Sequence, residues 1–324
     1  MNDDGPDPVL GRAQGCLLGQ LAGDSLGSLV EFKTPGEILA VYPGGVRDLA
    51  DGGTWGTLAG QPTDDSEMAL ALARMLVEKD GYDPGEARKA YLAWLDSRPF
   101  DCGVTIGSGL HGILMPGSQA NGALMRISPL GIFGSRFDLH RVAEWAAQDA
   151  MLTHPNPFCI QANALFAMAI AHAIRSGLHS RELYWQIDAW ARERNVDRPL
   201  LDVIAAAQGS PPADYLTNRG WVLVAFGNAI WQLLHARSLE EGVIDTVMRG
   251  GDTDTNAAIC GALLGAVYGR EAVPERWSRA ILDCRPEEGR PGVNRPRPNQ
   301  FWPVDALELA EQLLTAPAPG DPPA

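Results

Sequence analysis

The sequence GGDTDTN at residues 250–256 contains groups that could hold a metal ion. Two carboxylates and two hydroxyls alternate behind a pair of glycines, and an apolar segment at 257–268 follows. Such a turn can aim Asp252, Asp254 and Thr255 at one point, because glycine lets the backbone approach without a clashing Cβ. Oxygen-only ligands suit a hard cation such as Mg²⁺ or Mn²⁺ rather than zinc. The stretch therefore predicts part of a divalent-cation site.

One loop cannot complete an octahedral shell, and Thr63, Asp64 and Asp65 form the obvious second cluster. Thr63 is an expected N-cap, and the carboxylates then lie in the first turn of a helix. Taken alone, this pattern is also typical of plain capping aided by the helix dipole. Two acidic helix starts that face each other would repel unless cations lie between them. We therefore expect two ions that share carboxylates at the N-termini of two helices.

Composition limits the classes of partner. The 324 residues are 45% hydrophobic and carry a formal net charge of −14, which argues against binding to nucleic acid or to an anionic membrane. Five cysteines without CxxC spacing are expected to be reduced thiols. The first residues lack the pattern of a secretory signal, and the apolar runs at 162–174 and 257–268 are too short or too interrupted for a membrane span. We expect a cytoplasmic protein.

Glycine recurs at every fourth position from Gly11 to Gly27, and again at Gly261, Gly265 and Gly269. Each glycine weakens a helix by roughly 1 kcal/mol relative to alanine, so such a row predicts very close packing against another helix. No segment alternates with period two for long, which predicts an all-α fold. Helices are expected over 11–30, 64–79, 84–97, 125–133, 139–151, 157–176, 180–194, 200–208, 221–236, 239–248, 256–268, 274–282 and 304–315.

The remaining segments are expected to be irregular. Residues 32–61 are rich in Gly, Pro, Asp and Thr and predict a long connection with only short structure. Residues 285–303 predict a proline-rich loop. We expect a single compact domain over 9–315, built from roughly orthogonal helices, with a disordered tail at 316–324.

Taken together, six motifs carry a specific resemblance. The chain resembles the ADP-ribosylglycohydrolase family, which includes the dinitrogenase-reductase-activating glycohydrolase, from residue 11 to residue 314. The motifs are GCLLGQLAGDSLGSLVE at 15–31, PTDDSEM at 62–68, DCGVT at 101–105, NGALMR at 121–126, THP at 153–155 and GGDTDTNAAICGALLGAVYG at 250–269.

The resemblance implies an all-α protein with two Mg²⁺ or Mn²⁺ ions that cleaves the glycosidic bond between ADP-ribose C1″ and an acceptor. It implies six metal ligands, with Asp64 and Asp254 the best candidates for shared carboxylates. The six are Thr63, Asp64, Asp65, Asp252, Asp254 and Thr255.

Glu31, Asp101 and Asp65 are the candidate catalytic carboxylates. The resemblance implies that Glu31 lies beside the metals, either on an ion or over the scissile bond. A carboxylate near C1″ can stabilise the oxocarbenium-like sugar or activate water, which suits Glu31 or Asp101. The resemblance also implies that Asp101 faces an arginine guanidinium, with which a carboxylate can pair bidentately. Alternatively, Asp101 caps a turn beside Gly103.

Four further residues are implied to bind ADP-ribose. Asn121, Gly122 and Ala123 would donate hydrogen bonds to the diphosphate or ribose, although they also fit a plain turn before a helix. Ala120 replaces a serine that is often found at this position in the family. His154 would hydrogen-bond the ligand, and without the resemblance it would be a capping histidine before Pro155.

The expected activity is the metal-dependent removal of mono-ADP-ribose from arginine side chains of a modified protein, with ADP-ribose as product. Two other activities remain open, namely release from serine and cleavage of small ADP-ribose conjugates. A catalytically silent ADP-ribose-binding relative is the alternative outside the enzyme class. The presence of an oxygen-donating side chain at every expected ligand position, four of them acids, argues against that alternative.

Overall fold

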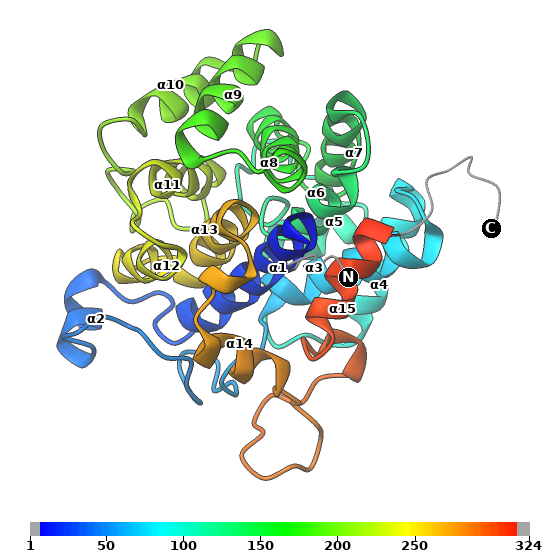
Figure 1. Ribbon diagram of the computed structural model, residues 1–324. Helices are drawn as coiled ribbons and strands as arrows, with labels where there is room; N and C mark the ends of the chain where they lie inside the picture. Colours follow the sequence, from blue (N-terminus) through cyan, green and yellow to red (C-terminus); the bar gives the residue numbers. More distant parts are fainter. Residues whose placement is uncertain (1–6, 316–324) are drawn as a thin grey trace, which may run out of the picture.

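The computed structural model describes residues 7–315 (Figure 1). This range contains fifteen α-helices, two short 3-10 helices and no strand, so the prediction of an all-α, single-domain fold is confirmed. Only two isolated bridges pair extended backbone within the described residues, Gly52 with Thr57 and Ala120 with Trp221. The tail expected at 316–324 lies outside the described residues.

Two central helices, α1 (Pro8–Gly27) and α13 (Thr253–Tyr268), lie side by side (Figure 1). Their backbones touch through the predicted glycine rows. A Cβ at Gly19 would overlap the carbonyl of Gly261, and a Cβ at Gly265 would overlap the carbonyl of Gly15. Because residue numbers fall along α13 as they rise along α1, the two helices are antiparallel. Close packing of this kind compensates for the poor helix propensity of glycine.

The antiparallel pair brings the end of α1 to the beginning of α13. A Cβ at Gly27, the last residue of α1, would overlap the backbone of Asp254. The hydroxyl of Thr253 donates to the carbonyl of Gly27 at 2.7 Å. The chain leaving α1 therefore passes directly beside the acidic first turn of α13.

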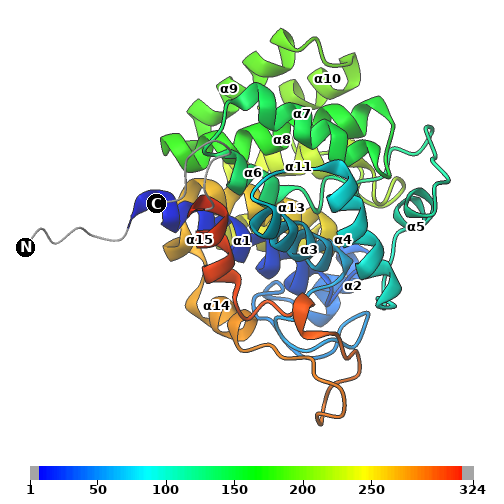
Figure 2. The ribbon, with the colours of Figure 1, turned by 90° about the vertical axis from the view of Figure 1, so that its right-hand side faces the viewer.

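The other helices surround this pair (Figures 1 and 2). Helices α11 (Val222–His235) and α12 (Leu239–Met248) pack on α13. Helix α15 (Ala306–Thr315) packs on α1, and α3 (Asp64–Lys79) begins beside both central helices. Other bounds are α4 Pro84–Asp96, α6 Ser128–Gly134, α7 Leu139–Met151, α8 Pro157–Ser176, α9 Ser180–Glu193, α10 Arg198–Ala206, η1 Arg270–Ala272, α14 Glu275–Leu282 and η2 Asn299–Phe301.

Two short helices were not predicted, α2 (Pro35–Val41) and α5 (Val104–Leu110). The first has a capping box between Thr34 and Glu37, which is a sequence signal for a helix start inside the segment predicted to be irregular. The second carries two glycines and no side-chain cap, so local propensity opposes it. Tertiary contact explains α5, because a Cβ at Gly109 would overlap the backbone of Thr153.

Some predicted boundaries were wrong by several residues. Helix α6 begins at Ser128 instead of Met125, because the backbone of Asn121 accepts bonds from the next residues in a turn. Helix α13 begins at Thr253 instead of Asn256, so Asp254 lies in the first helical turn.

Helix α8 is long and apolar enough to cross a membrane by length and composition alone. It has 20 residues and contains an 18-residue window with a mean hydropathy of 1.5, but 72% of that window is buried inside the protein. Burial of this extent is typical of a core helix. No other helix in the described range passes the same test.

Candidate metal centre and active site

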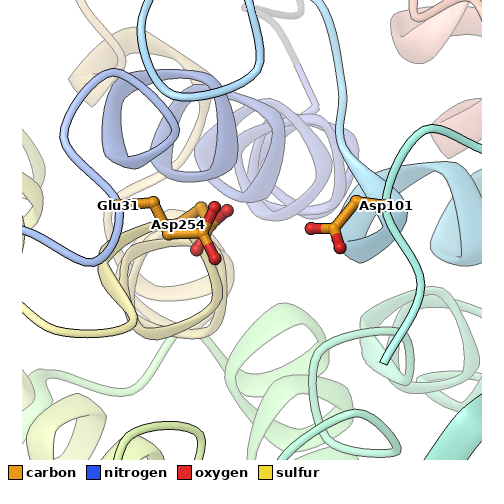
Figure 3. Close-up of side chains that lie close together, drawn as sticks. All are labelled: Glu31, Asp101 and Asp254. Atoms are coloured by element: carbon orange, nitrogen blue, oxygen red, sulfur yellow. The ribbon is translucent and has the colours of Figure 1, made fainter. Parts of the chain in front are cut away.

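Carboxylates from four separate segments meet in one cavity of about 220 Å³. Glu31 follows α1, Asp64 begins α3, Asp101 precedes α5, and Asp252 and Asp254 lie at the start of α13. Figure 3 shows Asp101 directed toward Glu31 and Asp254 from the opposite side. One ligand atom from each of these three residues lies within 4.8 Å of the others. The expected meeting of distant acidic segments is therefore present.

The cavity wall contains most, but not all, of the predicted site residues. Thr63, Asp65 and Ala123 do not line it and are almost completely buried, with exposed fractions of 0%, 1% and 0%. Those that line it are Glu31, Asp64, Asp101, Asn121, Gly122, His154, Asp252, Asp254 and Thr255.

Thr63 occupies the N-cap position of α3, but its side chain makes no capping bond to its own helix. Asp24 of α1 takes that role, accepting hydrogen bonds from the backbone N–H of Thr63 at 3.1 Å and of Ser66 at 3.1 Å. The Thr63 hydroxyl instead lies 2.8 Å from Asp24 Oδ1 and 3.0 Å from Asp65 Oδ2. Tertiary contact thus replaces local capping and directs this hydroxyl toward the acidic cluster.

Asp24 is the acid that sequence reasoning did not assign to the site. It is fully buried, and burial raises its pKa to about 6 despite the hydrogen bonds from Thr63 and Ser66. The glycine row of this segment predicted close helix packing but gave Asp24 no role. The available signal was a charged residue on a helix whose packing leaves no room for solvent.

The cluster is electrostatically unfavourable without cations. Burial and neighbouring carboxylates raise the pKa of Asp64, Asp65 and Asp254 well above the usual range, and that of Glu31 to about 8. Asp65 Oδ1 is buried without a hydrogen-bond partner. A group of oxygen donors with this much uncompensated negative charge fits hard divalent cations.

Asp101 lies close to two other acids of the cavity. The prediction directed it toward a substrate guanidinium or toward C1″, with a turn cap beside Gly103 as the alternative. One of its oxygens belongs to the same group as Glu31 and Asp254, so Asp101 could also contact an ion. Its pKa is raised by burial first and by the charge of Asp252.

Two of the three N–H donors of Asn121, one on the backbone and one on the side-chain amide, are used within the protein. Its backbone N–H donates to the carbonyl of Gly220 at 2.8 Å, and its amide donates to Asp252 Oδ2 at 2.7 Å. These bonds orient Asp252 in the cavity wall. Among the three predicted ADP-ribose donors at 121–123, Asn121 and Gly122 line the cavity.

His154 has a free ring nitrogen at the cavity. Its Nδ1 lies 2.7 Å from the Thr153 hydroxyl, while Nε2 is buried without a partner. Burial and the charge of Arg126 lower the pKa of His154 to about 3, so the ring is neutral at pH 7. The capping alternative was wrong, because Asn156 caps α8 through a bond from the N–H of Phe158.

We expect the metal-free protein to lose stability as the pH rises. The folded pKa of Asp24 is about 6 and that of Glu31 about 8, both above their unfolded values of 3.8 and 4.5. The folded state therefore binds these protons more tightly, and its stability falls between about pH 4.5 and pH 8. Excess Mn²⁺ should remove this decline by neutralising the cluster. Thermal unfolding in EDTA and in Mn²⁺ at pH 5, 6.5 and 8 measures the effect, and a Mn²⁺-dependent increment that does not grow with pH would contradict it.

The described residues thus form a helical domain with an acidic cavity at the starts of α3 and α13. Residues 6–320 match the family model described as ADP-ribosylglycohydrolase, and the chain belongs to this family of ADP-ribosyl hydrolases, as its motifs predicted.

Similar proteins support this membership over most of the chain. The ADP-ribosyl-[dinitrogen reductase] glycohydrolase of Rhodospirillum rubrum is 31% identical over 280 residues, covering 82% of this chain and 88% of that protein. The ADP-ribosylarginine hydrolase Tri1 of Pseudomonas putida is 27% identical over 295 residues, covering 85% and 76%. A solved structure described as an ADP-ribosylglycohydrolase-related protein complex matches with a TM-score of 0.77 and 25% identity, covering 94% of this chain and 98% of that one.

Proposed function

We propose that this protein is a metal-dependent hydrolase that removes mono-ADP-ribose from arginine side chains of a modified protein. The observation that carries the proposal is the convergence of Glu31, Asp101 and Asp254 in one cavity. The similarity to an ADP-ribosylarginine hydrolase from Pseudomonas putida supports the choice of arginine. The substrate would be an ADP-ribosylated protein, and free ADP-ribose the product.

The proposed cofactors are two divalent cations, Mg²⁺ or Mn²⁺. The residues that would hold them are Asp64, Asp252, Asp254 and Thr255 at the cavity wall, and the buried Thr63 and Asp65 on either side of Asp64 in the chain. When bound, the cations would neutralise the carboxylates and, as Lewis acids, hold the ribose hydroxyls. Asp24 keeps the Thr63 hydroxyl in place, and Asn121 does the same for Asp252.

Glu31 and Asp101 are proposed to act at the scissile bond. Cleavage leaves positive charge on the ribose, which a nearby carboxylate stabilises, and a carboxylate can also take a proton from the attacking water. Glu31 is proposed for the second task, because its carboxylate lines the cavity and faces Asp101 across it. His154 is neutral and can donate or accept a hydrogen bond through Nε2, which suits a ligand hydroxyl or phosphate oxygen.

Asp101 is proposed to select arginine, and the linkage of the substrate tests this proposal. We expect release from an arginine-linked ADP-ribosyl protein in Mg²⁺ or Mn²⁺, no release in EDTA, and much slower release from a serine-linked protein. Asp101→Ala should lower arginine-linked turnover about 10- to 100-fold, because a charge-assisted hydrogen bond contributes about 1.5–3 kcal/mol. Mn²⁺ binding should persist, as measured by equilibrium dialysis.

The matched control is Asp96→Ala, since Asp96 is exposed at the end of α4. Its turnover should equal that of the unmodified chain. Loss of Mn²⁺ binding in Asp101→Ala would instead make Asp101 a metal ligand, and unchanged turnover would remove it from the mechanism. A protein that retains ADP-ribose but frees none from either linkage, with or without chelator, would be a binding relative.

A further inference from the structure

Glu31 receives a hydrogen bond from a tryptophan that no motif singled out. The Trp55 indole N–H donates to Glu31 Oε2 at 2.6 Å. An indole nitrogen donates only and does not titrate, so this partner holds the carboxylate without competing for its proton. One carboxylate oxygen is occupied, which leaves the other for the cavity. A hydrogen bond from a fixed donor to a carboxylate also restricts the rotation of the carboxylate side chain.

The position of Trp55 is set by a short turn over the end of α1. Gly52 and Thr57 pair through two backbone hydrogen bonds of 2.7 and 3.0 Å, and Trp55 lies between them. The turn is attached to the segment that carries Glu31, because the Thr54 hydroxyl donates to the Glu31 carbonyl at 3.1 Å. Gly53, at φ +72°, has no room for a Cβ against the backbone of Leu29.

The same tryptophan connects Glu31 to the loop that carries Asp101. Its ring packs against that of Phe100, with ring centroids 6.0 Å apart. Arg295, from the proline-rich loop, donates to the Trp55 carbonyl at 2.8 Å and lies 5.9 Å from the Phe100 ring centroid. Trp55, Phe100 and Arg295 thus join three segments that are distant in the sequence.

A buried ion pair attaches the proline-rich loop to α3. Arg297 donates to both Glu67 oxygens, at 2.7 and 2.8 Å, and to the Ser97 carbonyl at 3.0 Å. Trp94 donates to the same Glu67 at 2.9 Å. The loop that holds Trp55 is therefore anchored to α3 and to the end of α4, directly before the Asp101 segment.

We propose that Trp55, held by Phe100 and Arg295, is a positioning residue that fixes the Glu31 carboxylate opposite Asp101. This proposal rests on the proposed function only for the role of Glu31 in turnover. Without the indole N–H, Glu31 can rotate out of the geometry that the reaction needs, while the metal ligands and the ADP-ribose contacts stay in place.

Trp55→Phe tests the proposal, because it removes the N–H and keeps an aromatic ring against Phe100. We expect kcat for ADP-ribose release to fall about 10- to 100-fold, as is typical for loss of a residue that orients a functional group. KM, Mn²⁺ affinity and ADP-ribose affinity should each stay within about twofold. Arg295→Ala, at an exposed position, should lower kcat in the same direction by a smaller factor and provides a second variant if Trp55→Phe folds poorly.

Nuclear magnetic resonance of ¹⁵N-labelled indoles gives a readout that does not depend on activity. The Trp55 signal is the one missing from the spectrum of Trp55→Phe. We expect Glu31→Gln to shift that signal and to speed its exchange with D₂O, since an amide oxygen is a weaker acceptor than a carboxylate. Trp185→Phe, at a position 53% exposed on α9, is the matched control and should leave kcat unchanged.

Each outcome decides one of the two proposals. Unchanged kcat in Trp55→Phe, or a parallel loss of kcat, thermal stability and ligand affinity, would overturn the positioning role but leave the proposed hydrolase intact. A Trp55 indole signal that is unchanged in Glu31→Gln would also overturn the positioning role. Failure of the unmodified chain to release any ADP-ribose would overturn the proposed function and, with it, the role of Trp55 in turnover.

Discussion

Replacing Asp64 and Asp254 together by asparagine is expected to lower ADP-ribose release by at least about 10³-fold. Divalent cations contribute several kcal/mol to such reactions, and each 1.36 kcal/mol corresponds to a factor of ten. The double variant should also lose the Mn²⁺-dependent rise in unfolding temperature. Release kinetics and thermal unfolding, each in Mn²⁺ and in EDTA, measure the two effects.

The same variant has an opposite effect in EDTA. Both carboxylates are buried, and neighbouring acids raise the pKa of each. Removing the two charges relieves repulsion, so the metal-free variant should be at least as stable as the metal-free parent at pH 8. Asp96→Asn makes the same aspartate-to-asparagine change at an exposed position. As the control, it should alter neither stability nor ADP-ribose release. Full activity in the double variant would contradict the assignment of this cavity as the metal centre.

Gly19→Ala is expected to destabilise the protein by about 3 kcal/mol or more. The new Cβ would overlap the backbone carbonyl of Gly261, and neither helix can give way without separating α1 from α13. Separation would also move Asp254 away from Glu31, so release should fall together with stability. Urea unfolding at fixed Mn²⁺ concentration measures the change in free energy.

Gly11→Ala gives a matched control on the same helix. A Cβ at Gly11 meets nothing within 4 Å. Alanine should therefore stabilise α1 by up to about 1 kcal/mol through its higher helix propensity. The same Gly-to-Ala substitution should therefore lower the free energy of unfolding at position 19 and raise it at position 11. Equal effects at both positions would mean that the contact between the two backbones does not stabilise the fold.

The central helices were predictable because their signals are local and periodic. The glycine rows predicted close packing, and the row from Gly15 to Gly27 meets α13 as expected. The two acidic motifs were readable for the same reason, since each is contiguous in the chain. Helix α5 was missed because its two glycines oppose local helix formation. One of them, Gly109, is required by close contact with Thr153, a partner far along the sequence.

The distribution of roles within the site could not be read from the motifs. Asp24 caps α3 from another helix, and Asp101 lies beside Glu31 and Asp254. Trp55 donates a hydrogen bond to Glu31 from a turn within the segment that was predicted to be irregular. Each of these relations joins segments that no local spacing connects.

Residue types alone were enough to specify an all-helical chain, oxygen-donor chemistry and the two acidic clusters, because helix propensity, packing periodicity and ligand preference are properties of short stretches. Which carboxylate faces the cavity, which one supports a neighbour and which donor holds Glu31 were decided by the three-dimensional packing. The physical reason is that burial, charge repulsion and hydrogen-bond direction depend on distances between segments, and these distances exist only after α1 and α13 have come together.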